Sequence, residues 1–168
     1  MNIEELKTGD IILVGGTSWL NKRIKKITKS RYSHIGIIYR AYDEILVVEQ
    51  DRTGFGGAGL ICTNINNYFN GKYDILLRRP NFYVDGSEYG KEFLKDLGRF
   101  RYSYFDLIVA QPILQLTGRW IGGTTMNDGR TVCSGYVAYI FDKFEKLYPK
   151  WYKMTPAQFE NDENFVDL

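Results

Sequence analysis

Three residues of this chain have side chains that together could carry out acyl transfer. His34 is the only histidine in 168 residues, and Glu49 follows it in the stretch SHIGIIYRAYDEILVVEQ. A carboxylate beside a histidine fixes its tautomer and stabilises its imidazolium, as a general base requires. Cys133 stands far downstream in VCSGYVAYIF, and a thiol next to such an imidazole becomes a nucleophile. The alternatives are a structural histidine beside a surface glutamate and a cysteine that serves as a small core residue.

The pairing of His34 with Glu49 depends on a predicted β-hairpin. Two apolar, β-branched runs flank the polar segment AYDE, which is typical of a hairpin. With the turn centred on Tyr42 and Asp43, Glu49 lies opposite Gly36, and His34 lies diagonal to Glu49 on the same face. Diagonal residues are roughly 7–8 Å apart at the backbone, which the two side chains can span. A turn longer by one residue would place Glu49 on the other face.

The cysteine lies at the start of a predicted helix. Apolar residues at helical spacing follow it until Pro149, and Thr131 is the expected N-cap. Cys133 then falls in the first turn, where the helix dipole favours a thiolate and main-chain N–H groups can hold an oxyanion. Ser134 and Gly135 are small and permit close approach to this helix start.

The remaining elements are predicted from periodicity and turn residues. Leu6–Val14 is predicted to contain a polar turn at Thr8–Asp10 that leads into a short strand, and further strands are expected at Leu60–Thr63 and Tyr73–Arg79. Helices are expected at Ser18–Lys29, at Glu88–Phe100 with Ser87 as cap, and after Thr155. Pro112 is expected to break the apolar stretch Leu107–Leu116, the glycine-rich Gly54–Gly59 to form a flexible loop over the active cleft, and the acidic tail to be loosely packed.

Composition limits the classes of protein to be considered. The length fits one domain over residues 1–168, and a net charge of +2 gives no reason to expect nucleic acid as a partner. Cys62 and Cys133 form neither a disulfide framework nor a zinc site, so neither a metal nor an organic cofactor is expected. Met1–Asp10 is polar and acidic, unlike a signal peptide, which favours a cytoplasmic protein or a phage or viral product.

The helix expected at Ser18–Lys29 is basic and amphipathic. Such a helix could make peripheral contact with a membrane or an anionic polymer. A solvated outer face is the simpler explanation.

In the order of its motifs the chain resembles the circularly permuted branch of the NlpC-type papain-like cysteine hydrolases. The strand YSHIGI and the strand VVEQ come first, and RYSYFD and VCSGYVAYIF follow, which is the reverse of the unpermuted order. The resemblance covers about Thr8 to Phe144. It implies an α+β fold in which an antiparallel sheet packs against helices and the nucleophile lies at a helix N-terminus.

The resemblance also implies a role for each matching residue. Cys133 matches the nucleophile, His34 the general base and Glu49 the residue that orients the imidazole. Residues matched to the oxyanion or substrate-binding region are Tyr102, Tyr104 and Ser134. Val132 departs from the pattern, because unpermuted members commonly carry aspartate there.

Three functions follow as hypotheses. The first is cleavage of amide or peptide bonds, with peptides or peptidoglycan fragments as substrates, through a Cys-His-Glu triad and an acyl-enzyme. The second is lipid acyl hydrolysis, thioester hydrolysis or acyl transfer by the same triad. The third is a binding module without turnover.

Overall fold

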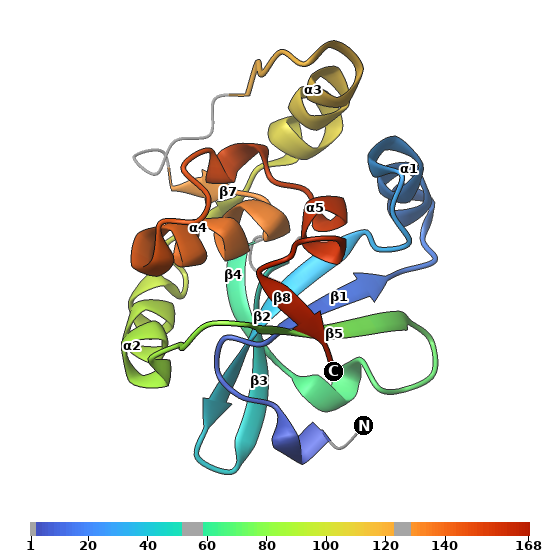
Figure 1. The fold of residues 1–168 in the computed structure, drawn as a ribbon. Coiled ribbons are helices and arrows are strands. Elements are labelled where there is room, and N and C mark those ends of the chain that lie inside the picture. Colours follow the sequence, from blue (N-terminus) through green and yellow to red (C-terminus); the bar gives the residue numbers. More distant parts are fainter. Residues whose placement is uncertain (1–2, 52–58, 123–128) are drawn as a thin grey trace.

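The protein has a mixed α+β fold built on one eight-stranded sheet (Figure 1). The computed structural model describes residues 3–51, 59–122 and 129–168. The strand order is β7-β6-β4-β3-β2-β1-β5-β8, and neighbouring described strands are antiparallel except β6 and β7. The strands are β1 (Ile11–Gly15), β2 (His34–Ala41), β3 (Glu44–Asp51), β4 (Gly59–Asn64), β5 (Asp74–Pro80), β6 (Arg101–Tyr102), β7 (Arg130–Thr131) and β8 (Phe165–Asp167).

The helices are short apart from α1, α2 and α4. In chain order they are η1 (Ile3–Glu5), α1 (Trp19–Thr28), η2 (Ile65–Asn67), α2 (Gly86–Asp96), the π-helix η3 (Asp106–Ala110), α3 (Gln111–Thr117), α4 (Cys133–Glu145), η5 (Trp151–Lys153) and α5 (Pro156–Glu160). None of these described helices combines the length and the apolar composition needed to cross a bilayer.

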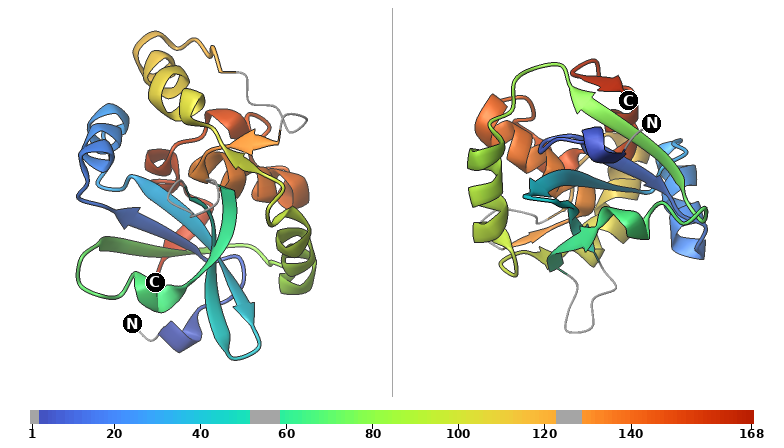
Figure 2. Two further views of the ribbon diagram at one scale, coloured as in Figure 1. Left: turned by 180° about the vertical axis from the view of Figure 1, so that it is seen from behind. Right: turned by 90° about the horizontal axis from the view of Figure 1, so that it is seen from below.

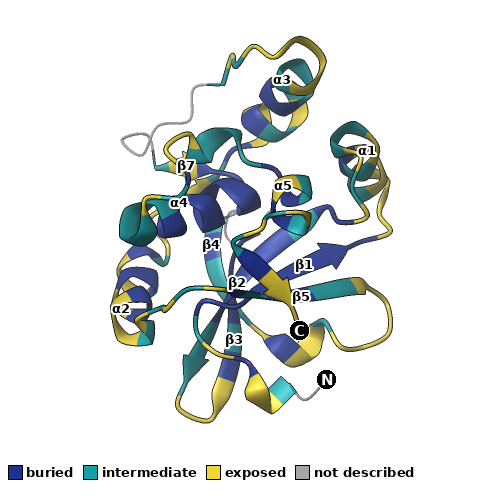
Figure 3. Cartoon of the chain, viewed as in Figure 1, coloured by how far each residue is buried: buried dark blue, intermediate teal, exposed yellow. Residues whose placement is uncertain are grey.

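Both faces of the sheet are covered, so its central strands are apolar at successive positions. Ile11 and Leu13 of β1 pack into the larger core, which α2 and α4 complete from one side of the sheet (Figure 2). Ile12 and Val14 point the other way, into a smaller core that includes residues next to η1 and η2. Buried residues accordingly fill the centre of the sheet and the inner side of α4 (Figure 3).

The hairpin forms in the predicted register. Ala41 pairs with Glu44 and Ile37 with Val48, so the two-residue turn is Tyr42 and Asp43. Tyr42 has φ 53°, the left-handed conformation that such two-residue turns require. This register places His34 and Glu49 on the same face of the sheet.

Two predicted helix caps are wrong by one or two residues. Asp85, rather than Ser87, caps α2, because its carboxylate accepts from the N–H groups of Ser87 and Glu88. Thr131 belongs to β7, and the extended Val132 is the N-cap of α4. Pairing of β7 with β6 holds Thr131 in the sheet, where it cannot take the cap position.

The predicted break at Pro112 does not occur. The π-helix η3 precedes α3 directly, and Pro112 lies in the first turn of α3. Proline lacks an N–H and its ring crowds the carbonyl of the preceding turn, and a wider π turn placed just before it relieves both problems.

The acidic tail is packed rather than loose. Its strand β8 pairs with β5 and buries Phe165. Arg78 of β5 donates to the carbonyls of Phe159, Asp162 and Phe165, which fixes the tail to the sheet. The predicted flexible loop Gly54–Gly59 lies outside the described residues except for Gly59, which begins β4.

Candidate active site

His34 and Glu49 meet at the end of the hairpin, as the register requires. His34 is the first residue of β2, and Glu49 lies near the end of β3. The ring Nε2 of His34 and Oε2 of Glu49 form a hydrogen-bonded pair. A larger residue does not fit at Gly36 beside this pair, because a Cβ there would lie 2.3 Å from Cγ1 of Val47.

Glu49 is buried and held ionised by several donors. Its side chain is only 3% exposed. Burial acts to raise the pKa of this carboxyl, but hydrogen bonds from His34, Thr63 and Tyr68 outweigh it, and the pKa lies below its usual value. Glu49 therefore remains a carboxylate beside the imidazole at neutral pH.

Cys133 is the first residue of α4 and is 3% exposed. Helix α4 packs across β2 and β3, which brings its N-terminus over the hairpin end that carries His34. The N–H groups in the first turn of any α-helix have no acceptor within the helix, so an oxyanion next to Cys133 would find donors there. Gly135 is required in this turn, because a Cβ there would lie 2.6 Å from Oγ1 of Thr131.

The imidazole and the thiol interact directly. Burial lowers the pKa of His34, but a hydrogen bond and electrostatic attraction to Cys133, together with the same two effects from Glu49, raise the pKa well above 6.5. Since Glu49 takes Nε2, the other ring nitrogen, Nδ1, remains for the sulfur. The arrangement favours a resting imidazolium stabilised on both sides.

A polar cavity of about 210 Å³ opens on the imidazole side of this cluster. Its lining includes His34, Glu49, Gln50, Tyr68 and Tyr102. Such a cavity has hydrogen-bonding groups for a polar substrate next to the base.

A second, apolar cavity of about 30 Å³ lies on the thiol side. Ile24 and Ile27 of α1, Leu107 of η3 and Pro112 of α3 surround Cys133 there. Ile24 and Ser33 line both cavities, so the imidazole and the thiol lie between a polar and an apolar space.

The other three predicted site residues differ in their settings. Tyr102 lines the polar cavity. Tyr104 packs its ring against that of Tyr102 with centroids 5.2 Å apart, is 46% exposed and is not among the lining residues of either cavity. Ser134 lines the apolar cavity, but its hydroxyl donates to the carbonyl of Met154 at 2.6 Å, which leaves its main-chain N–H for an oxyanion.

Sequence reasoning missed the residues that support Glu49. Tyr68 follows η2 and donates to Glu49, and Thr63 on β4 provides a further hydrogen bond. No local pattern marks Tyr68, which is one of 13 tyrosines. Thr63 lies on β4, which pairs with the strand of Glu49. Side chains of β4 point alternately to the two faces of the sheet, and this alternation was the one signal that could have placed Thr63 on the same face as Glu49.

No protein-family profile matches this sequence, and no curated protein matches it. Among solved structures, the chain is similar to the crystal structure of metalloprotein yiiX from Escherichia coli O157:H7, with a TM-score of 0.55 and 17% identity over 96% of each chain. This likeness shows the fold. Within the described residues, no three His, Cys, Asp or Glu side chains are grouped so that they could hold a metal ion.

Proposed function

We propose that the protein is a cysteine hydrolase of amide or peptide bonds, with Cys133 as nucleophile, His34 as general base and Glu49 as the residue that orients the base. The observation that carries the proposal is the position of one imidazole between a buried carboxylate and a thiol at a helix N-terminus. The resemblance to permuted NlpC-type hydrolases in motif order supports the same assignment.

The mechanism follows from these contacts. His34 holds the proton of the Cys133 thiol, and the sulfur attacks the carbonyl carbon of the substrate. N–H groups in the first turn of α4 stabilise the tetrahedral oxyanion, and His34 then gives its proton to the leaving amine. Water, deprotonated by the same imidazole, releases the acyl group from the sulfur. Glu49 stays ionised throughout and keeps Nε2 of the ring engaged.

The polar cavity favours a peptide-like substrate, since its lining offers both hydrogen-bond donors and acceptors. Peptides and peptidoglycan fragments are the corresponding substrate class. The solved neighbour is described as a metalloprotein; within the described residues of this chain, no three His, Cys, Asp or Glu side chains are grouped so that they could hold a metal ion.

A second candidate function is lipid acyl hydrolysis or transfer. The apolar cavity next to Cys133 favours it, because a hydrocarbon chain attached to the reacting carbonyl would extend into that space. At about 30 Å³ the cavity holds little more than one small group, so an acyl chain requires α1 and α3 to move apart.

The experiment is an intact-mass assay for the acyl-enzyme. The protein is incubated separately with muropeptides and with phospholipids, and both the protein and the products are analysed by mass spectrometry. We expect an adduct on Cys133 and released amine from muropeptides, absent from Cys133→Ala and retained in the matched control Cys62→Ala. An adduct and free lysolipid from phospholipids alone would instead favour the second candidate.

The thiol itself provides a check that does not depend on the substrate. Iodoacetamide should alkylate Cys133 faster than Cys62 at pH 6, because Cys133 lies at a helix N-terminus beside the imidazole of His34, whereas burial raises the pKa of Cys62. His34→Gln should remove this difference. Equal rates for the two thiols in the unmodified protein would count against any catalytic role and favour a binding module.

A further inference from the structure

Helix α1 presents a surface of unpaired positive charge. It carries no acidic residue, and none of its cations, nor the one that follows it, forms an ion pair within the described parts of the chain. These five cations are Lys22, Arg23, Lys25, Lys26 and Lys29. Ile24 is buried and faces the apolar cavity, so the opposite side of the helix is the basic one.

Large apolar side chains are also exposed on α1 and on the helices next to it. Trp19, in the first turn of α1, is 69% exposed, and the guanidinium of Arg23 lies 4.8 Å from its ring centroid. Ile108 of η3 is 55% exposed and Leu116 of α3 is 84% exposed. Single exposed apolar residues are ordinary on a soluble protein, but these belong to neighbouring helices, since α1 contacts α3 and η3 runs directly into α3.

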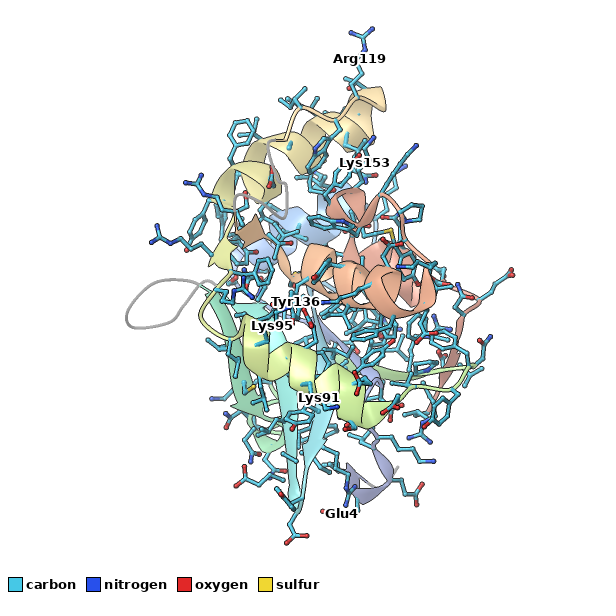
Figure 4. All side chains as sticks on the ribbon, turned by 90° about the vertical axis from the view of Figure 1, so that its left-hand side faces the viewer. Glu4, Lys91, Lys95, Arg119, Tyr136 and Lys153 are labelled. Atoms are coloured by element: carbon cyan, nitrogen blue, oxygen red, sulfur yellow. The ribbon has the colours of Figure 1, made fainter. Side chains whose placement is uncertain are left out.

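The two helices α1 and α3 also lie at one end of the molecule. They project beyond the sheet on the same side in both the front and the back view (Figures 1 and 2). Arg119, just after α3, extends outward from this end (Figure 4). We call the outer side chains of Trp19, Arg23, Lys26, Ile108 and Leu116 the α1–α3 face.

We propose that the α1–α3 face docks on the surface of an anionic lipid bilayer. Cations bind the lipid head groups, while Trp19, Ile108 and Leu116 enter the boundary between head groups and acyl chains. Because the apolar side of α1 packs against the protein, α1 would contribute its cations and Trp19 to the contact, and Ile108 and Leu116 would contribute the aliphatic part. A nucleic acid would match the cations but would leave the aliphatic side chains of η3 and α3 in water.

Docking in this way has a consequence for the cluster around Cys133. The apolar cavity lies between α1 and α3, and both helices contribute to its walls. A bilayer docked on the outer side of these two helices would therefore lie next to helices that line the cavity from the inside. The docking proposal does not itself require Cys133 to be catalytic.

The test is co-sedimentation with vesicles of phosphatidylcholine alone and with vesicles that contain phosphatidylglycerol at 30 mol%. All proteins carry Cys133→Ala, so a failure of the proposed function cannot alter the result. The charge variant is the triple substitution Lys22→Gln, Arg23→Gln and Lys26→Gln. Its matched control is Lys72→Gln, Lys91→Gln and Lys95→Gln, which removes the same charge elsewhere, with Lys91 and Lys95 on α2 (Figure 4).

We expect binding to the anionic vesicles only. Each basic residue near such a surface contributes roughly fivefold to the partition coefficient, so the charge variant should bind on the order of 100-fold more weakly. The control triple should stay within about threefold of the unmodified surface, because its cations would lie outside the contact and beyond most of the screened field.

The apolar part of the face is tested separately. The pair Trp19→Ser and Leu116→Ser should weaken binding at least tenfold, while the control pair Tyr83→Ser and Leu94→Ser, 83% and 60% exposed elsewhere, should not. Circular dichroism and thermal melting establish that each variant is folded. Trp19 fluorescence should shift to the blue on vesicles, and this shift should be absent in Trp19→Phe.

Three results would overturn the proposal. The first is absence of binding to anionic vesicles at low ionic strength. The second is equal weakening by both charge triples, which would mean that only net charge matters. The third is an affinity for anionic vesicles that the pair Trp19→Ser and Leu116→Ser does not reduce, together with an equal affinity for a single-stranded oligonucleotide. This result would make the face a general binding site for polyanions.

Discussion

The single histidine permits a direct measurement of the electrostatics at the candidate site. In tag-free protein the proton on the carbon between the two ring nitrogens gives one imidazole resonance, which must belong to His34. The perturbation is Glu49→Gln, which keeps the size of the side chain and an acceptor oxygen but removes the charge. The pKa of His34 should fall, because burial, which lowers it, would then be opposed by Cys133 alone.

The size of the effect follows from the burial of the pair. Two unit charges 4 Å apart interact by about 4 kcal/mol at an effective dielectric constant near 20 and by about 1 kcal/mol in bulk water. Glu49 is 3% exposed and the His34 side chain is 21% exposed, so the pair lies between these limits. At a fixed pH the ratio of imidazolium to imidazole should therefore fall by a factor between about five and about a thousand.

The assay is a proton NMR titration of the unmodified protein and the variant under identical salt. Cys133→Ser should also lower the pKa of His34, since it removes the interactions with the Cys133 side chain that raise this pKa, whereas Cys62→Ser should leave it unchanged. The reasoning is refuted if His34 in the unmodified protein titrates at or below 6.5, or if the folded Glu49→Gln variant titrates where the unmodified protein does.

Three further predictions concern stability. Gly135→Ala should lower the free energy of unfolding by about 1–3 kcal/mol in urea titrations, because the added methyl group would lie 2.6 Å from Oγ1 of Thr131. An unchanged free energy of unfolding would mean that the backbone of this turn shifts to relieve the contact. Arg78→Met should cost at least about 3 kcal/mol by the same assay, because three carbonyls lose their donor, whereas Arg31→Met, which breaks an exposed ion pair, should change little. Glu49 has a lowered pKa, so its contribution to stability is complete above the usual value near 4.5 and is lost as the pH falls through the folded-state pKa. Glu49→Gln should therefore weaken the dependence of the unfolding free energy on pH in this acidic range. An unchanged pH dependence in the variant would contradict a lowered pKa for Glu49.

Local sequence predicted the elements that carry the site more successfully than the contacts that complete it. The hairpin register followed from two turn residues and the alternation of the strands, so the amino-acid pattern alone was enough to predict the juxtaposition of His34 and Glu49. The start of α4 was predicted to within two residues, although Val132 and not Thr131 is its cap. In both cases the determining interactions are close in sequence.

The contacts that were missed all depend on tertiary structure. Tyr68 reaches Glu49 because η2, which precedes it, packs against β3. Strand β8 forms because it pairs with β5. The helical path through Pro112 depends on the π turn before it, which neither helical periodicity nor the usual behaviour of proline predicts. These features therefore depend on contacts between residues far apart in the sequence or on the neighbouring turn, which the periodicity of apolar residues does not predict.

The order of the elements along the chain has a consequence for biosynthesis. During translation the imidazole–carboxylate pair of the hairpin leaves the ribosome well before α4, which carries the thiol. A nascent or prematurely terminated chain that lacks α4 therefore lacks Cys133. If Cys133 is the nucleophile, as proposed above, such a chain would hold the imidazole–carboxylate pair without the thiol, and the site would be complete only after α4 has been made.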